Sequence, residues 1–205
     1  MKSYQIDNNT VNLPETLSEV SVKQIIEIHN LGELTGSVND VIRLINIFAD
    51  TPVDLNTIDL GNILEISVQL SSVLFENKQI EPIDRFVIDG KEYFCQEPNE
   101  LSVKEFIDFQ EISKEPIDNL PLLLALVYKE KDEQEPSDDE YMTVIMAKKA
   151  KFLDLDAKTA QGCLLFFSEA FANYVINTLE SLETTPEQKA ILKKTAMELR
   201  NQKTA

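Results

Sequence analysis

The chain has 205 residues, of which 43% are hydrophobic, and its formal net charge is −17 at pH 7. An apolar share of this size is typical of a folded soluble domain, so a core is expected and wholesale disorder is not. An acidic surface repels phosphate backbones and anionic headgroups, so neither nucleic acid nor a membrane is an expected partner for the body of the protein.

The first expected elements are a hairpin and a capped helix. Apolar and polar side chains alternate over residues 4–13 around a turn signal at Asp7–Asn9, which predicts a β-hairpin. In the stretch VSVKQIIEIHNL, Ser21 and Gln24 stand three residues apart as a capping box, so a helix is expected to begin here. The apolar residues of this helix that are expected to pack are Val22, Ile25 and Ile26.

Two further helices complete the first half. Apolar residues from Val41 to Phe48 recur at helical spacing, and this helix is expected to end before Pro52. The stretch VDLN follows from Val53, and a third helix is expected from about Ile58 to Phe75. The first half therefore reads as a hairpin followed by three helices.

The second half repeats this order of signals. Residues 86–95 read as a second hairpin, whose Asp89–Gly90 pair favours a type I′ turn. In the stretch LSVKEFIDFQEI, 81 positions after VSVKQIIEIHNL, Ser102 and Glu105 form a second capping box. The apolar residues that are expected to pack here are Val103, Phe106 and Ile107.

The later signals of the second half also have counterparts. Residues from Leu120 to Tyr128 take the place of the second helix, and LDLD from Leu153 corresponds to VDLN. Gly162 matches Gly61 just inside the long third helix. An acidic segment at about 129–141 has no counterpart in the first half, which indicates an insertion.

These parallels predict an α+β, predominantly helical fold, built by tandem duplication of a hairpin-plus-helices unit. The expected divisions are a first unit at 1–79, a second unit with its insertion at 80–182, and a basic C-terminal helix at 183–205. The competing explanation is chance similarity between amphipathic helices, because helical periodicity is common. The conserved order of the other elements favours duplication.

The C-terminal segment differs from the body in charge. A capping-box signal at Thr185 predicts a helix start. Residues 186–205 include five basic and two acidic residues, which leaves −20 on the first 185 residues. Attraction between these charges favours binding of the segment to its own body or to a neighbouring copy, and nucleic acid is a weaker alternative. The candidate interaction residues are Lys189, Lys193, Lys194 and Arg200.

The sequence contains no motif that points to catalysis, a cofactor or a metal, since it lacks a Gly-rich phosphate loop, a CxxC pair and HExxH. His29 is the only histidine; Gln110 holds the matching position in the second half, so His29 is expected to be a solvated residue. Cys95 and Cys163 stand singly among apolar residues and are expected to be buried, with a disulfide as the alternative. We expect no enzyme activity, no cofactor, and an intracellular soluble protein without a signal peptide.

The acidic run of the insertion raises a metal-binding alternative. Carboxylates suit Ca²⁺, but a dedicated loop needs a glycine at its sharp turn, and Pro136 interrupts this run instead. A solvated, mobile insertion is the favoured interpretation, and a metal-binding intracellular enzyme is the alternative function. The acidic residues concerned are Asp132, Glu133, Glu135, Asp138, Asp139 and Glu140.

The second half resembles a class of viral proteins. FVIDGKEYFC, LSVKEFIDFQEI, LPLLLALVY, an acidic gap and AKFLDLDAKTAQGCLLFFSEAF occur in an order that resembles small structural and assembly proteins of tailed bacteriophages. These include tail-assembly and baseplate-assembly chaperone-like proteins and small virion proteins of crAss-like phages. The resemblance implies a non-enzymatic tail, neck or ring component that forms a homo-oligomer and binds other phage structural proteins. It implies a virion location after assembly in the bacterial cytoplasm, with a transient assembly chaperone as the alternative.

Overall fold

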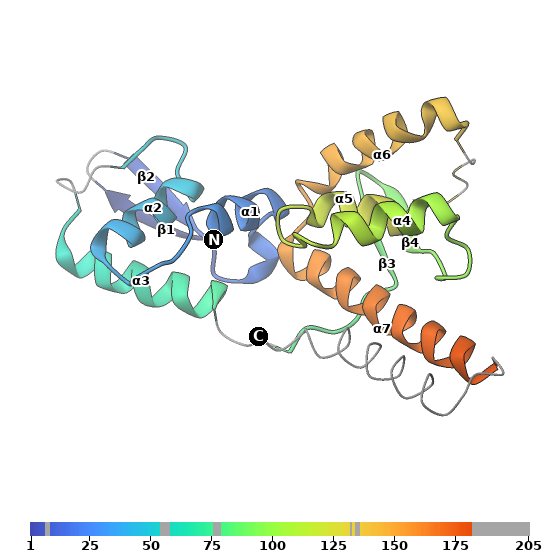
Figure 1. Cartoon of the computed structure of the whole chain (residues 1–205). Coiled ribbons are helices and arrows are strands. Elements are labelled where there is room, and N and C mark those ends of the chain that lie inside the picture. The colour runs from blue at the N-terminus through green and yellow to red at the C-terminus, as the bar shows by residue number, and fades with distance from the viewer. Residues whose placement is uncertain (7–8, 54–57, 76–78, 132, 134–135, 182–205) are drawn as a thin grey trace.

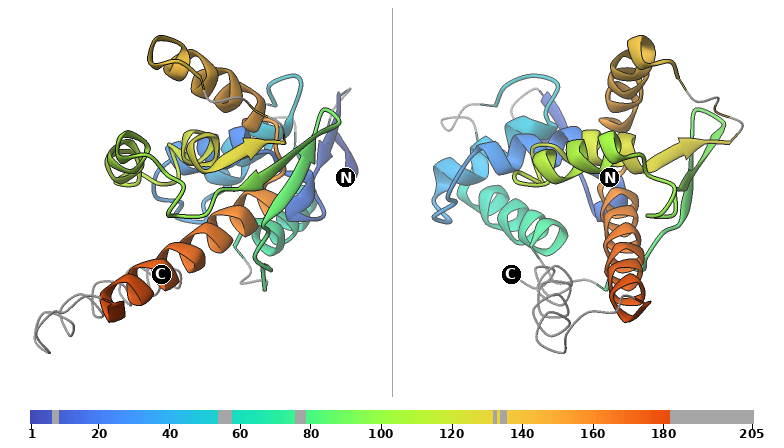
Figure 2. Two further views of the ribbon diagram at one scale, coloured as in Figure 1. Left: turned by 90° about the vertical axis from the view of Figure 1, so that its right-hand side faces the viewer. Right: turned by 45° about the vertical axis from the view of Figure 1, so that its right-hand side comes forward.

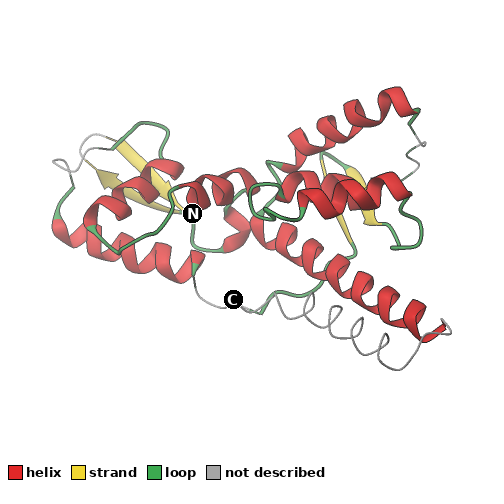
Figure 3. Cartoon of the chain, in the orientation of Figure 1, coloured by secondary structure: helices red, strands yellow, loops and turns green. Residues whose placement is uncertain are grey.

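The structure, a computed structural model, describes residues 1–6, 9–53, 58–75, 79–131, 133 and 136–181. The fold is mixed α+β and predominantly helical, as the sequence predicts. Figure 1 shows two lobes side by side, the first coloured blue to teal and the second green to red. Each lobe has its own small antiparallel sheet (Figure 3).

The elements of the described residues confirm the expected hairpins and helices in both halves. The first lobe contains β1 (Lys2–Ile6), β2 (Asn9–Leu13), a 3₁₀ helix (Leu17–Glu19), α1 (Val22–Asn30), α2 (Val38–Phe48) and α3 (Leu60–Leu74). The second lobe contains β3 (Arg85–Ile88), β4 (Lys91–Cys95), α4 (Val103–Ile112), α5 (Leu120–Val127), β5 (Tyr128–Glu130), α6 (Asp138–Phe152) and α7 (Ala157–Ser181).

The first lobe is held together by a core between its hairpin and helices. β1 and β2 pair antiparallel with Tyr4 opposite Val11, so alternate side chains point to the same face. The capping box of Ser21 is present, and α2 begins at another, formed by Ser37 and Asp40, which the sequence analysis did not single out. The most deeply buried side chains of this core are Ile6, Leu13, Ile45, Ile66 and Leu70.

The second lobe is built around α5. Seven of its eight residues are buried, because a helix that is apolar on all sides needs cover all round. The sheet, in the order β3-β4-β5, packs Phe86 and Tyr93 against Phe152 of α6, with ring centroids 5.1–5.4 Å apart. Asp89 and Gly90 both have positive φ, 52° and 75°, as the type I′ turn requires.

The start of α1 joins the two lobes. The amides of Val22 and Lys23 donate to the carbonyls of Leu155 and Leu153, at 2.8 and 2.9 Å. In return the amide of Ala157 donates to the carbonyl of Val20 at 2.7 Å. The side chain of Val22 belongs to the core of the second lobe, so the first lobe contributes a residue to the core of its neighbour.

The expected packing of α4 is wrong for two of its three apolar residues. Val103 is 78% exposed and Ile107 is 57% exposed, whereas Phe106 is partly buried and stacks on Phe171 of α7. The capping box of Ser102 is nevertheless present. The difference arises because the matching face of α1 is covered by the second lobe, whereas the face of α4 that carries Val103 is left open.

The acidic segment is predicted to be a solvated insertion, but both of its ends form regular secondary structure. Its start forms β5, which pairs with β4, and its end forms the first turn of α6, capped by Ser137 with Glu140. Glu133 is only partly exposed, and its carboxylate accepts a hydrogen bond from Lys148 of α6 at 3.1 Å. The solvated interpretation is therefore wrong for Glu133, although Asp139 and Glu140 are exposed.

Some expectations lie outside the described residues. The turn at 7–8 and the C-terminal helix expected from Thr185 are among them.

α7 is the longest described helix, and its C-terminal half projects away from the second lobe (Figure 2). None of the helices in the described part of the chain has the length and hydropathy needed to cross a membrane.

Candidate functional site

A groove of about 880 Å³ lies in the second lobe between β4, the loop that follows it and α7. Three aromatic side chains line it: Phe94 from β4, and Phe166 and Tyr174 from α7. Phe94 and Tyr174 are about two-fifths exposed, at 41% and 40%. Aromatic residues that combine large area with partial exposure are enriched where proteins bind one another, so the groove is a candidate interaction surface.

Four of the five charged residues that line the groove form two ion pairs. Asp84 contacts the guanidinium of Arg85 at 3.1 Å, and Glu92 lies 3.9 Å from Lys131. The hydrogen bond from Arg85 lowers the pKa of the Asp84 carboxyl. These four charges cancel and only Glu97 adds a further charge, so the groove has a net charge of −1 and little excess to attract a strongly charged ligand.

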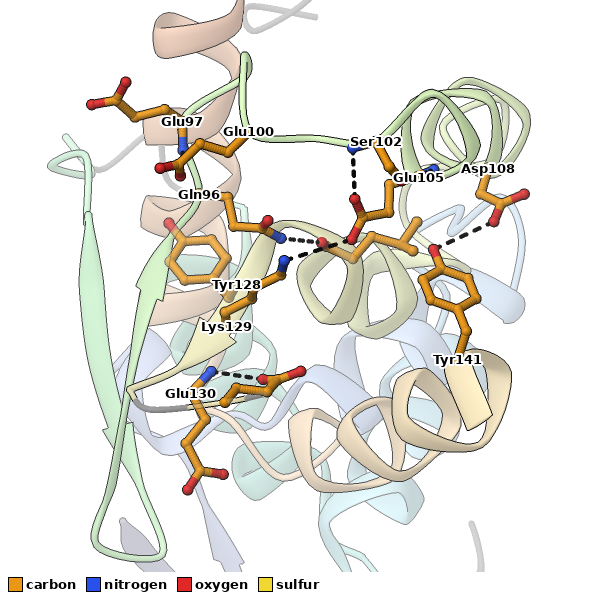
Figure 4. A network of polar contacts seen from close by, with 12 residues as sticks. Gln96, Glu97, Glu100, Ser102, Glu105, Asp108, Tyr128, Lys129, Glu130 and Tyr141 are labelled. Atoms are coloured by element: carbon orange, nitrogen blue, oxygen red, sulfur yellow. Dashed lines mark hydrogen bonds and ion pairs between the residues drawn. The ribbon is translucent and has the colours of Figure 1, made fainter. Parts of the chain in front are cut away.

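A network of polar contacts fixes the loop that forms one wall of the groove (Figure 4). The side-chain amide of Gln96 donates to the carbonyl of Leu126 at 2.9 Å, and the amide of Glu97 donates to Glu100 at 3.0 Å. Gln96 is 3% exposed, and its side-chain oxygen has no hydrogen-bond partner among the described residues. The loop is therefore pinned to α5 and is a rigid wall.

The same network continues into α4 and β5. Glu105 accepts from the backbone amide of Ser102 at 2.7 Å and lies 4.0 Å from the ammonium of Lys129 (Figure 4). Tyr141 of α6 donates to Asp108 at 3.4 Å, which ties α6 to α4. Burial is the main cause of the raised pKa of Tyr141. These contacts set the position of α4, whose outer face carries Val103.

A buried ion pair lies beneath the sheet. The ammonium of Lys148 donates to the carbonyl of Tyr128 and to the carboxylate of Glu133, both at 3.1 Å. Burial lowers the pKa of Lys148, and the negative charge of Glu133 partly offsets this effect. Glu133 also accepts from the amide of Glu130 at 2.9 Å, so the pair fixes the chain that leaves β5.

The cysteines are free and unreactive in this setting. Cys163 is buried and Cys95, which lines the groove, is partly buried, so the predicted burial is confirmed for Cys163 and only in part for Cys95. Burial raises the pKa of each thiol to about 12. Both remain protonated at neutral pH, and the thiol is a much weaker nucleophile than the thiolate. What the groove offers is shape and aromatic surface for binding.

The other candidate residues from the sequence are His29, the basic residues of the C-terminal segment and the acidic run. His29 lies exposed at the end of α1, as expected. The predicted interaction residues Lys189, Lys193, Lys194 and Arg200 lie outside the described residues. In the part of the chain that the structure describes, no three His, Cys, Asp or Glu side chains gather closely enough to hold a metal ion.

Sequence reasoning missed the groove and α6. The groove residues come from β3, β4, the following loop and α7, and no local pattern links segments so far apart in the chain. The start of α6 had a readable signal, because Ser137 and Glu140 form a capping box of the same kind as those recognised at Ser21 and Ser102. Comparison with known proteins finds no matching family model, no matching curated protein and no matching solved structure.

Proposed function

We propose that this protein is a non-enzymatic structural component of a tailed bacteriophage particle, in its tail, neck or ring, and acts through contacts with other proteins. The observation that carries the proposal is the apolar surface of its helices. α3, α4 and α6 each present exposed apolar residues four positions apart. These residues are Leu60, Leu64 and Val68 on α3, Val103 and Ile107 on α4, and Met142 and Met146 on α6. Exposed apolar side chains that follow one helix face mark sites of protein association.

We also propose that the two lobes arose by tandem duplication. Each contains a hairpin, a serine-capped helix, a second helix and a long helix in the same order, and the second adds β5 and α6. Two related units in one chain present related surfaces, which suits an assembly of many copies. The aromatic groove beside α7 supplies a further surface for a different structural protein.

The basic C-terminal segment has a separate role in this proposal. Its net charge of +3 and the −20 on the rest of the chain favour contact with an acidic neighbour. Deletion of the residues after Leu182 is expected to weaken self-association and incorporation into particles, and salt is expected to weaken the same contact. If the truncated chain self-associates and enters particles as the full chain does, the C-terminal segment has no part in the proposed association.

The copy number in purified particles tests the function directly. Phage particles from a genome that encodes the chain are purified, and the protein is quantified by mass spectrometry against the major capsid protein. A fixed number of copies per particle is expected for a structural component. Abundance in the infected cell combined with absence from the particle would replace the proposal with an assembly chaperone, and absence from both would reject it.

A further inference from the structure

α1 and α4 occupy equivalent positions but differ in what covers them. Each follows a hairpin, starts after a serine capping box and has a valine as its first residue. Val22 in α1 is 0% exposed, because this face packs into the second lobe. Val103 in α4 is 78% exposed, and Ile107 one turn later is also exposed. The same kind of apolar face is therefore buried once in the chain and left open once.

α3 and α7 also differ in what covers their first residues. Each is the long helix of its lobe, and an aspartate just before it accepts a hydrogen bond from an amide of the first turn. Ala157, the first residue of α7, is 1% exposed and packs with Val20 in the segment that leads into α1. Leu60, the first residue of α3, is 65% exposed, and the open face continues through Leu64 and Val68.

We propose that the open face of α4 in one copy of the chain binds the open face of α3 in a second copy. The α4 face is Val103 with Ile107, and the α3 face is Leu60, Leu64 and Val68. Within one chain the start of α1 packs against the start of α7 in a related way, since Val22 belongs to the core that includes Ala160 of α7, and Val20, just before α1, packs with Ala157. The contact between copies deepens the proposed structural role and rests on it, because it names the surfaces through which copies associate.

The two faces lie far enough apart to allow a continuous assembly. In Figure 1, α3 begins at the outer end of the first lobe, at the left of the view, whereas α4 begins at the outer side of the second lobe, at the right. A contact between two different faces leaves one open face at each end of a pair. Addition of copies therefore continues until the assembly closes as a ring or grows as a filament.

Charge gives this contact a distinctive dependence on salt. Each copy has a net charge of −17, so copies repel one another at low ionic strength, while the proposed faces are apolar. Added salt screens the repulsion and leaves the apolar contact in place, so association is expected to strengthen. A contact made by the basic C-terminal segment has the opposite dependence, which separates the two modes.

Sedimentation velocity of the full chain over a series of concentrations tests the proposal. The wild-type chain is expected to form species larger than a dimer. One variant combines Val103→Glu with Ile107→Glu, and another combines Leu60→Glu with Leu64→Glu. Each is expected to weaken association at least about a hundredfold, because charges replace central apolar contacts. An alanine pair at Val103 and Ile107, which adds no charge, is expected to weaken it at least about tenfold.

Mixing the two glutamate variants is the decisive measurement. The α4 variant keeps an intact α3 face, and the α3 variant keeps an intact α4 face, so the mixture is expected to form a heterodimer and nothing larger. Val87→Glu is the control, because Val87 is 65% exposed and lies on β3, which contributes to neither face. This control is expected to associate like the wild-type chain. At protein concentrations where all chains are monomeric, circular dichroism melts should coincide for all variants, since the replaced side chains are exposed.

Three results would overturn the proposal. The first is a wild-type chain that stays monomeric at all concentrations and salt levels. The second is an α3 variant that still self-associates while the α4 variant does not, which indicates a symmetric contact between α4 helices. The third is a mixture that stays monomeric. These results concern the purified chain, so they are independent of the particle mass spectrometry, and either proposal can fail while the other stands.

Discussion

Replacement of Gly162 by alanine is expected to destabilise the protein, although alanine is the better helix former. Gly162 lies inside α7, where the segment that links the two lobes crosses it. A Cβ atom here meets the carbonyl oxygen of Glu81 at 2.7 Å and the side chain of Ile83 at 2.7 and 2.8 Å. Contacts this short require a backbone shift, because a carbonyl oxygen cannot rotate away as a flexible side chain can.

The linking segment is held in place from two sides. The amide of Ile83 donates to the carbonyl of Gly162 at 3.0 Å, and the hydroxyl of Tyr128 donates to the carbonyl of Ile83 at 2.6 Å. Overpacking of a fixed site costs about 1–3 kcal/mol, and this site is at the upper end because the clash includes backbone. The helix propensity of alanine returns about 1 kcal/mol. The net loss is therefore about 2 kcal/mol, or about 4–8 °C in Tm.

Urea and thermal unfolding followed by circular dichroism measure this loss. Gly61→Ala is the control, since Gly61 is the other helical glycine, near the start of α3, and its added Cβ meets only the side chain of Asp59, at 3.0 Å. The control is expected to lose less than about 1 kcal/mol, because the Asp59 carboxylate that caps α3 has to shift slightly while alanine favours the helix. A Gly162→Ala chain as stable as the wild type would show that the linker does not press on α7 and would refute the reasoning.

Three further predictions concern buried polar groups. Glu133→Gln is expected to cost about 3 kcal/mol in urea unfolding, because Lys148 then stays buried without its counter-charge. Lys148→Met should cost less, because the Glu133 side chain is more exposed, at 15% against 8%, and its carboxylate can regain water; equal losses would contradict this. Asp40→Asn should lower Tm at neutral pH, since hydrogen bonds from a threonine and a serine lower the pKa of Asp40 from 3.8 to about 2. That stabilisation is present above 3.8 and is lost as the pH falls towards 2, so the two Tm values should converge there; a constant gap argues against it. Cys163, which is buried, should react with a thiol reagent at neutral pH only as fast as the chain opens, whereas Cys95, which lines the groove, should react slowly because its thiol stays protonated; rapid labelling of either in the folded chain would contradict the raised pKa values.

The elements that sequence analysis predicted well are those fixed by neighbouring residues. Ser21 with Gln24 and Ser102 with Glu105 form their capping boxes as expected, because each box joins residues three positions apart. The turn at Asp89–Gly90 was readable for the same reason: positive φ at two successive residues favours few residue types. Element order and fold class follow from such local signals.

The parts that sequence analysis missed depend on contacts between distant segments. The groove joins β4 to α7, and the burial of Glu133 depends on Lys148, fifteen positions later and on another element. An acidic run reads as solvated unless its partner is known, because the pattern of charge in the run contains no information about a lysine on the next helix. The site could therefore not be assembled from the sequence alone.

The exposed face of α4 shows why this limit of sequence analysis matters for the proposed function. Amphipathic spacing establishes that Val103 and Ile107 belong to an apolar face, but it does not establish which surface covers that face. For α1 the covering surface is in the same chain, so Val22 is buried. For α4 the periodicity is equally clear, yet the described chain leaves the face open. An apolar face that one half of the chain buries and the other half exposes is what a subunit that adds copies of itself requires, because its last contact must be made by the next copy.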